Sequence, residues 1–404
     1  MKHLDGSITA PLGFLAAGLH CGIRKNRLKK DLMLIFAEKP CDAAAVYTQN
    51  RVKGAPIVVT QKNLASGSAR AVICNSGNAN TCNADGIEKA EQMCAFAAQA
   101  LGIRPDQVVV ASTGVIGLPL PIAPIKKAVP SLAKALSREG SIAAVDAIMT
   151  TDTRRKQFAV EFELGGKACR IGGIAKGSGM IHPNMATMLS FLTTDADIEP
   201  ALLYEALLDT ARETFNMVSI DGDTSTNDMA CILASGLAGN ARVAARGAEY
   251  DAFREALGEV CTCLAREIAR DGEGASRLLE CRVTGAKCTE DAREAAKSVI
   301  GSSLVKAAMF GADANWGRVL CALGYSAARV DPLLVDVAFS SKGGRVNVCK
   351  SGTGLDFSEE EAAAVLKCDE VVIHVDLNEN EASAVAWGCD LTYGYVKING
   401  DYRT

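Results

Sequence analysis

The chain has 404 residues, of which 49 % are hydrophobic and 22 % are charged, and its formal net charge is −4. This composition predicts a globular protein of two or three domains and gives no reason to expect a nucleic-acid partner. Residues 1–12 lack the apolar core of a signal peptide, and no apolar run approaches the roughly 20 residues of a membrane span. We therefore expect a cytosolic protein that does not bind a membrane.

The fifteen cysteines and four histidines show no spacing typical of a metal site. Only Cys261 and Cys263 lie close together, and the sequence has no Cys-x-x-Cys pair. We therefore expect buried free thiols in a reducing compartment and no structural metal.

The first half of the chain predicts alternating strands and helices. Strands are expected over residues 31–38, 70–75 and 108–111. Residues 86–101 predict a helix, because apolar side chains recur at helical spacing and Gly102 follows as a stop. After the third strand comes Thr113-Gly114, which on local pattern alone is most often a plain turn.

Two helical segments of different quality follow. Residues 118–136 contain four prolines, which predict a broken helix because proline lacks the backbone N–H that a helix interior uses. A shorter helix over residues 141–149 leads directly to Thr150 and Thr151. These two threonines, followed by Asp152, therefore come directly after the end of a helix.

A β-hairpin is predicted next. Residues 157–164 alternate polar and apolar side chains, the Gly165-Gly166 pair suits a two-residue turn, and residues 167–175 are expected to return as the second strand. The second strand of this hairpin ends at Lys176.

The stretch over residues 176–194 begins with residues that favour turns and continues with residues that favour a strand. Gly177, Gly179 and Pro183 favour turns, whereas residues 187–193 read as a short strand, so the hydroxyl of Thr187 lies at a loop-to-strand junction. On local pattern alone, Thr187 is simply the first residue of a half-buried strand.

A second interpretation of this junction is a peptide bond that cuts itself. The Thr187 hydroxyl would attack the carbonyl carbon of Ala186, the acyl group would move from nitrogen to oxygen, and water would hydrolyse the ester. The freed α-amine of Thr187 has an ordinary pKa of about 7.7 to 8.0, so it can accept the proton of its own hydroxyl near neutral pH.

Downstream, helices are expected over residues 199–215 and 250–269, with a strand over residues 229–234 between them. The loop 221–228 carries three aspartates but lacks the glutamate that ends a calcium-binding loop. We therefore expect it to be a hydrogen-bonded loop that supports a site, not a metal site. Glu273 lies between two glycines on a turn, which by itself is an ordinary solvated loop.

The last part of the chain predicts a smaller α/β region. It follows a strand expected over residues 277–284 and a helix expected over residues 289–300. Its own expected strands cover residues 333–340, 344–350, 371–377 and 382–398, and its expected helix covers residues 358–366. No short repeat or low-complexity linker separates the parts of the chain.

Nine short motifs, in order from one end of the chain to the other, are similar to those of the ornithine acetyltransferase family, the glutamate N-acetyltransferases of arginine biosynthesis. The central motif is KGSGMIHPNMATML, from Lys176 to Leu189. The others are GFLAAGLHCGIR (13–24), CNSGNAN (74–80), STGVIG (112–117), MTTDT (149–153), SIDGDTSTNDM (219–229), DGEGAS (271–276), FGADANWGR (310–318) and YVKINGDYRT (395–404).

The resemblance implies a two-step acetyl transfer, from N-acetylornithine to Thr187 and from Thr187 to glutamate. Thr187 would be the nucleophile and its own amine the base, while the Thr113 hydroxyl and the Gly114 N–H would form the oxyanion hole. The substrate would be bound by Thr150, with Thr151 as the alternative neighbour, and by Lys176, Glu273, Asn399 and Thr404. No metal or organic cofactor is implied, and acetyl-CoA would be a second donor only in bifunctional members.

The resemblance also implies a fold and an assembly. The fold would be α/β, an α+β layered sandwich of the N-terminal-nucleophile type with a smaller C-terminal α/β domain. Cleavage between Ala186 and Thr187 would give residues 1–186 and 187–404, of which about 187–285 would complete the core domain and about 286–404 would form the smaller one. Two cleaved chains would assemble as an α2β2 heterotetramer.

Two other functions compete with this interpretation. An aminopeptidase or amidase with the same kind of N-terminal nucleophile would use water in place of glutamate as the acceptor. A nucleotide- or phosphate-binding protein could use residues 176–179 and the loop 221–228, but the Gly-x-x-x-x-Gly-Lys-Ser/Thr pattern is absent.

Overall fold

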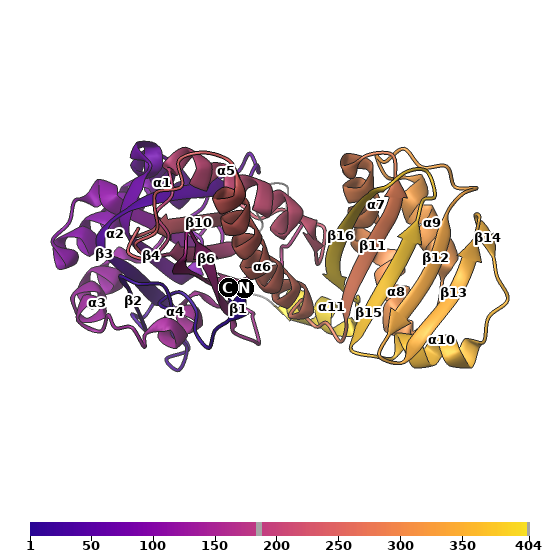
Figure 1. Cartoon of the computed structure of the whole chain (residues 1–404). Coiled ribbons are helices and arrows are strands. Elements are labelled where there is room, and N and C mark those ends of the chain that lie inside the picture. The colour runs from indigo at the N-terminus through magenta and orange to yellow at the C-terminus, as the bar shows by residue number, and fades with distance from the viewer. Residues whose placement is uncertain (183–187, 402–404) are drawn as a thin grey trace. The chain divides into compact units, whose positions relative to one another are not determined.

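The computed structural model describes residues 1–182 and 188–401, which form two compact units (Figure 1). The first unit comprises residues 1–177, 184–215 and 224–264, and the second comprises residues 178–183, 216–223 and 265–404. No helix of the described residues is long and apolar enough to cross a membrane. Each of the fifteen cysteines is a free thiol, and most of them are buried.

The first unit is built on a nine-stranded sheet with the order β1-β6-β7-β8-β10-β3-β4-β5, in which β2 also pairs with β3. Its strands are β1 (Lys2–His3), β2 (Phe14–Leu19), β3 (Leu32–Tyr47), β4 (Ser68–Asn78), β5 (Val108–Val115), β6 (Lys156–Leu164), β7 (Lys167–Lys176), β8 (Leu189–Thr194) and β10 (Met229–Ala234).

The long strand β3 divides this sheet into two layers. Its first part pairs with β2 and β4, its last part pairs with β10, and the register with β4 shifts between Phe36 and Cys41. One hydrophobic core contains residues from both groups of strands, such as Ile35 and Val109 from the first and Phe191 and Cys231 from the second. The sheet therefore folds over, with buried side chains between its two layers.

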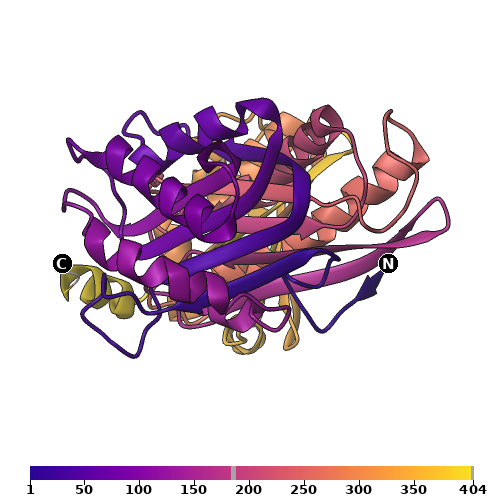
Figure 2. The ribbon, with the colours of Figure 1, turned by 90° about the vertical axis from the view of Figure 1, so that its left-hand side faces the viewer.

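Helices cover the outer faces of both layers. One outer face carries α1 (Ala55–Asn63), α2 (Gly86–Leu101) and α3 (Ile122–Lys134), whose apolar sides form a second core with β3, β4 and β5. In Figure 2 the violet helices of this layer lie in front of the strands. The other layer contacts α5 (Pro200–Glu213) through β3 and α6 (Ala248–Arg270) through the rings of Phe162 and Phe253, and α4 (Ser141–Ile148) packs into the core between the layers. The unit is thus an α/β/β/α sandwich, which confirms the expected fold class.

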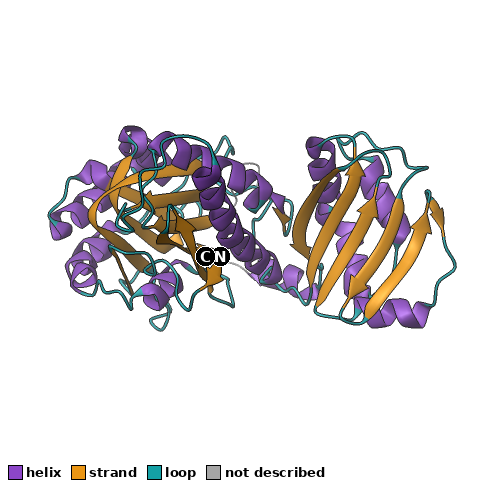
Figure 3. Ribbon diagram, in the orientation of Figure 1, coloured by secondary structure: helices purple, strands orange, loops and turns teal. Residues whose placement is uncertain are grey.

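The second unit contains a seven-stranded sheet with the order β14-β13-β12-β15-β11-β16-β9. In Figure 3 most of its helices lie behind the sheet, against one face. The strands are β9 (Val218–Ser219), β11 (Leu278–Ala286), β12 (Asp336–Ser341), β13 (Gly344–Lys350), β14 (Thr353–Gly354), β15 (Glu370–Asp376) and β16 (Ala382–Cys389). The helices of this unit, besides the end of α6, are α7 (Thr289–Gly301), α8 (Ser303–Gly311), α9 (Trp316–Gly324), α10 (Glu359–Leu366) and α11 (Tyr393–Asp401).

Two expectations about local structure were wrong. Residues 118–136 were expected to form a broken helix, but α3 is continuous from Ile122 to Lys134. Pro124 lies in the first turn, where a backbone N–H has no partner within the helix, so only Pro130 removes a helical hydrogen bond. The strand expected over residues 382–398 ends at Cys389, and Asn399 lies in helix α11.

Candidate active site

Thr113 and Lys176 meet in the first unit although their strands are far apart in the sheet order. Thr113 lies near the end of β5 and Lys176 ends β7, and each is only 9 % exposed. The Lys176 Nζ donates a hydrogen bond to Thr113 Oγ1 over 3.3 Å. An ammonium can only donate, so the threonine oxygen accepts and its own hydrogen remains available for another acceptor. The two-layered sheet therefore assembles a hydroxyl donor next to a cation.

Gly114 is required by close approach of the backbone. Its φ is +128°, and a Cβ at this position would lie 2.4 Å from the carbonyl carbon of Gly77 on the neighbouring strand β4. Any other residue would force β4 and β5 apart. Gly114 therefore allows β4 and β5 to pack closely, and this close packing fixes the backbone directly beside Thr113.

Asp152 joins Thr150 to the end of β7. Its Oδ2 accepts hydrogen bonds from the Thr150 backbone N–H at 2.8 Å and the Thr150 hydroxyl at 3.4 Å. Its Oδ1 accepts from the Lys156 ammonium and from the Gly177 backbone N–H, both at 2.7 Å. Burial opposes ionisation of this carboxyl, but Lys156, Lys176 and the Gly177 N–H hold its pKa well below the ordinary value. Asp152 is therefore an ionised, buried carboxylate that connects Thr150, Lys156 and Gly177.

Asn227 supports the backbone on which Thr113 lies. Its side-chain amide donates to the carbonyl oxygens of Ala79 at 2.6 Å and Ser112 at 3.0 Å, and its Oδ1 accepts from the Thr81 hydroxyl at 2.6 Å. The loop 221–228 is thus hydrogen-bonded, as expected, and its last part belongs to the first unit. No local sequence pattern indicates which side chain of this loop makes these contacts.

Asp228 is a buried acid that sequence reasoning did not single out. It is 4 % exposed and directly precedes β10, and among the described residues its Oδ2 has no hydrogen-bond partner. Burial raises the pKa of Asp228 well above its ordinary value, although a hydrogen bond from Ser225 and the charge of Lys176 act in the opposite direction. The site thus contains two buried carboxyls, Asp152 and Asp228, with opposite pKa shifts.

Asp228→Asn is expected to increase stability at neutral pH but not at low pH. The folded chain binds the Asp228 proton more tightly than the unfolded chain, whose pKa is about 3.9, so the wild type loses stability as the pH rises above that value. The amide stays neutral, so the gain in the free energy of unfolding should grow as the pH rises, as measured by urea titrations at several pH values. The exposed Asp223→Asn is the control, and a pH-independent difference for Asp228→Asn would contradict this account.

In the second unit, Glu273 and Asn399 are hydrogen-bonded to each other. The Asn399 side-chain amide donates to Glu273 Oε2 at 2.8 Å and to the Tyr395 carbonyl oxygen at 3.1 Å. Glu273 is half-buried on the turn after α6, and Asn399 lies on the exposed side of α11. Two residues predicted to bind substrate are therefore brought together, with a carboxylate and an amide side by side.

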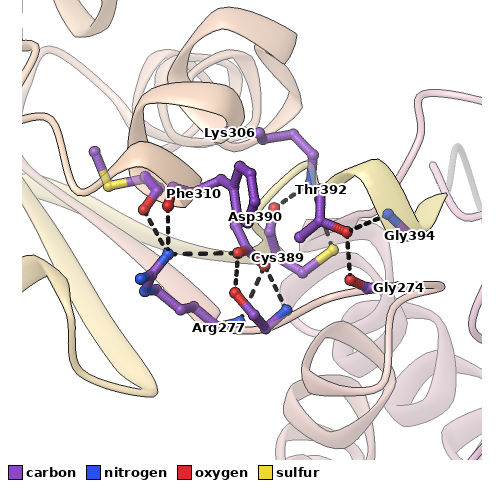
Figure 4. Close-up of polar contacts among 10 residues, drawn as sticks. Gly274, Arg277, Lys306, Phe310, Cys389, Asp390, Thr392 and Gly394 are labelled. Carbon is purple, nitrogen blue, oxygen red and sulfur yellow. Dashed lines mark hydrogen bonds and ion pairs between the residues drawn. The ribbon is translucent and has the colours of Figure 1, made fainter. Parts of the chain in front are cut away.

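A buried polar network fixes the segment that leads into α11 (Figure 4). Asp390 accepts hydrogen bonds from the backbone N–H groups of Ser276 at 2.8 Å and Arg277 at 3.0 Å. The Thr392 hydroxyl donates to the Gly274 carbonyl oxygen at 2.6 Å and accepts from the Gly394 N–H at 3.0 Å. Because Gly274 follows Glu273 directly, this network sets the position of α11 relative to the Glu273 turn.

Lys306 and Arg277 complete this network. The Lys306 ammonium, 3 % exposed, donates to the Cys389 carbonyl oxygen at the end of β16. The Arg277 guanidinium donates to the carbonyl oxygens of Met309 at 2.8 Å and Phe310 at 3.0 Å, and it lies 3.6 Å from Asp390. These cations join α8 to the end of β16 and to the segment before β11.

The predicted site residues divide between the two units. Thr113, Gly114, Thr150 and Lys176 belong to the first unit, and Glu273 and Asn399 to the second. Ala186, Thr187 and Thr404 lie outside the described residues. Over residues 1–182 and 188–401, no group of three or more His, Cys, Asp and Glu side chains could bind a metal ion.

The fold defines the class of protein as a layered α/β/β/α sandwich, and the comparisons with known proteins add its family. The chain belongs to the ArgJ family, which it matches over residues 15–404. It is 54 % identical, over the whole of both chains, to the "Arginine biosynthesis bifunctional protein ArgJ" of Symbiobacterium thermophilum. It is 52 % identical to ArgJ 1 of Clostridium acetobutylicum, over 97 % of this chain and 96 % of that one.

A solved structure agrees with this assignment. The crystal structure of "Arginine biosynthesis bifunctional protein argJ" from Bacillus halodurans is similar with a TM-score of 0.51 and 48 % identity, and it covers 54 % of this chain and 100 % of that one. The family resemblance is therefore confirmed, and the chain is an acyltransferase of arginine biosynthesis.

Proposed function

We propose that the chain transfers the acetyl group of N-acetylornithine to glutamate through an acetyl-Thr187 intermediate. In the first step, the Thr187 oxygen forms a bond to the acetyl carbon, the bond from that carbon to the ornithine nitrogen breaks, and ornithine leaves with a proton. In the second step, the glutamate amine attacks the ester and the Thr187 hydroxyl is restored. The Thr187 α-amine accepts and returns the proton in each step.

The single observation that carries this proposal is the buried bond from Lys176 to Thr113. Each step passes through a tetrahedral intermediate with negative charge on the acetyl oxygen. A hydroxyl whose oxygen already accepts a bond from an ammonium is a polarised donor for that charge, and the Gly114 N–H would be the second donor. Donors of this kind contribute about 3 kcal/mol each in acyl transfer.

The enzyme would become active by cleavage of the Ala186–Thr187 bond. One comparison supports this: the whole of the solved Bacillus halodurans chain corresponds to 54 % of this chain. Residues 187–404, the proposed second fragment, likewise make up about 54 % of the 404 residues. A separate chain of this length is what self-cleavage at Thr187 would produce.

Substrate binding and assembly complete the proposal. As the family resemblance implies, the amino-acid part of the substrate would be bound by Thr150, Lys176, Glu273, Asn399 and Thr404. The relatives are named bifunctional, which supports acetyl-CoA as a second acetyl donor. We expect a cytoplasmic α2β2 heterotetramer of cleaved chains.

The experiment that tests this function separates transfer from hydrolysis. Purified protein is mixed with N-acetylornithine, with and without glutamate, and ornithine, acetate and N-acetylglutamate are measured. We expect N-acetylglutamate to form in equal amount to ornithine, with little acetate. Acetate release at the same rate with or without glutamate would instead support the amidase alternative. Replacing N-acetylornithine by acetyl-CoA tests the second activity.

Thr113→Ala is expected to lower kcat by about 100-fold or more with a modest change in KM. The hydroxyl is proposed to act on the intermediate and not on substrate binding, so its loss affects the rate of the chemical step. Thr113→Ser, which keeps the hydroxyl, is the matched control and should retain most of the activity. Steady-state kinetics check this, and an unchanged kcat for Thr113→Ala would remove Thr113 from the mechanism.

A further inference from the structure

The segment 178–182, which leads toward the proposed cleavage site, has an unusual backbone conformation. Met180 has a φ of +56°, in the left-handed region that residues other than glycine rarely adopt. A conformation of this kind persists only where surrounding contacts impose it.

The Asp221 carboxylate supplies these contacts. Its Oδ2 accepts a hydrogen bond from the Met180 N–H at 2.6 Å, and its Oδ1 accepts from the Ile181 N–H at 2.8 Å. The Ile220 N–H in turn donates to the Ile181 carbonyl oxygen at 2.7 Å. One side chain therefore fixes two successive peptide groups, and hydrogen bonds to a charged acceptor are stronger than those between neutral groups.

The Glu273 turn holds the preceding residues of the same segment. The Glu273 N–H donates to the Ser178 carbonyl oxygen at 2.8 Å. A Cβ at Gly179 would lie 2.4 Å from the Glu273 carboxyl carbon, so a larger residue there would displace the Glu273 side chain. The segment 178–181 is thus fixed from two sides, by Asp221 and by Glu273.

Helix α11 is joined to the same contacts. The Tyr395 hydroxyl donates to Asp221 Oδ2 at 3.4 Å, and Asn399 bonds to Glu273 one turn further along the helix. Burial raises the pKa of Tyr395, and the charges of Asp221 and Glu273 raise it further. Tyr395 therefore stays a neutral donor to the carboxylate that positions Met180 and Ile181.

We propose that Asp221 is a positioning residue for self-cleavage at the Ala186–Thr187 bond, and that it acts by fixing the backbone of Met180 and Ile181, which precede that bond in the sequence. This inference rests on the proposed function and adds to it a residue that does not touch the reacting atoms. An N-to-O acyl shift needs the hydroxyl oxygen near the preceding carbonyl carbon, so its rate depends on how well the chain before the bond is oriented.

The test compares cleavage rates of full-length chains made by cell-free translation and sampled over time by denaturing electrophoresis. We expect Asp221→Asn to slow cleavage by about tenfold or more, because an amide oxygen accepts one of the two N–H groups and the amide nitrogen faces the other. Asp223→Asn, an exposed change in the same loop, is the matched control and should cleave at the wild-type rate. Equal rates for Asp221→Asn and the wild type would overturn the inference.

A second variant distinguishes positioning from a general loss of folding. Glycine adopts a positive φ without strain, so adding Met180→Gly to Asp221→Asn should restore part of the cleavage rate. A double variant that is no faster than Asp221→Asn would also overturn the inference, since Asp221 would then not act through Met180. A wild-type chain that never cleaves would instead contradict the proposed function itself, and the positioning role with it.

Discussion

Thr187→Ala is expected to give a chain that stays in one piece and has no transferase activity. Without the hydroxyl, no oxygen can attack the Ala186 carbonyl carbon, so the amide bond is not converted to an ester. Without cleavage, the α-amine that would accept the proton remains in a peptide bond, and no oxygen is available to carry the acetyl group. Electrophoresis of the fragments and the rate of N-acetylglutamate formation measure the two losses.

Thr187→Ser is the matched control for this change. Serine keeps the attacking oxygen but lacks the methyl group that restricts the side-chain rotamer, so we expect slow cleavage and reduced activity. Full activity in an uncut Thr187→Ala chain would show that Thr187 is neither the nucleophile nor the cleavage residue.

Lys156→Met is expected to destabilise the first unit by about 3–5 kcal/mol, the loss typical of breaking a buried ion pair. The side chains of Lys156 and Asp152 are both 0 % exposed, and Lys156 Nζ lies 2.7 Å from Asp152 Oδ1. Methionine fills the space of the lysine stem but leaves the carboxylate without its closest charge. Urea unfolding followed by circular dichroism measures the change.

The pH dependence gives this prediction a definite sign. The folded-state pKa of Asp152 lies well below its unfolded value of about 3.9, so its contribution to stability is present above that value and is lost as the pH falls. Lys156→Met should therefore flatten the loss of stability in acid.

Two further variants serve as controls for the buried pair. Lys62→Met breaks an exposed pair with Glu91, and its effect should lie within about 1 kcal/mol. Changing Asp152 to Asn together with Lys156→Met should restore part of the lost stability, because no charge is then left unpaired. An effect of Lys156→Met as small as that of Lys62→Met would contradict the assigned role of this pair.

Local sequence patterns predicted many elements correctly. The helix at residues 86–101 and the strand at 229–234 have the bounds that apolar spacing indicated, and the hairpin around Gly165-Gly166 is present, with positive φ at both glycines. These elements depend on side-chain periodicity and on residues that favour turns, and both are visible within a short window. The helices α8 and α9 were not predicted.

The features that local patterns did not predict depend on contacts between residues that are far apart in the sequence. The strand expected to run to residue 398 ends at Cys389 because Asp390 turns toward Ser276 and Arg277, and Thr392 accepts the Gly394 N–H at the start of α11. Lys176 reaches Thr113 only because β3 changes its pairing partners along its length. No single sequence window contains that information.

The two buried carboxyls of the site show the same limit of prediction from local sequence. Asp152 and Asp228 both follow polar residues in loops. Three cations follow only Asp152 in the sequence, but their order does not indicate which of them is buried against the carboxyl. Their pKa values shift in opposite directions because one lies against Lys156 and the Gly177 N–H, whereas the other retains an oxygen that has no hydrogen-bond partner among the described residues. This difference arises only from the folded structure.

The most direct measurement is the intact mass of the protein after incubation with N-acetylornithine in the absence of glutamate. We predict two fragments, residues 1–186 and 187–404, with one acetyl group on the second, located at Thr187 by peptide mapping and lost when glutamate is added as N-acetylglutamate appears. An unmodified full-length chain that nevertheless forms N-acetylglutamate, or an acetyl group on any other residue, would contradict the account.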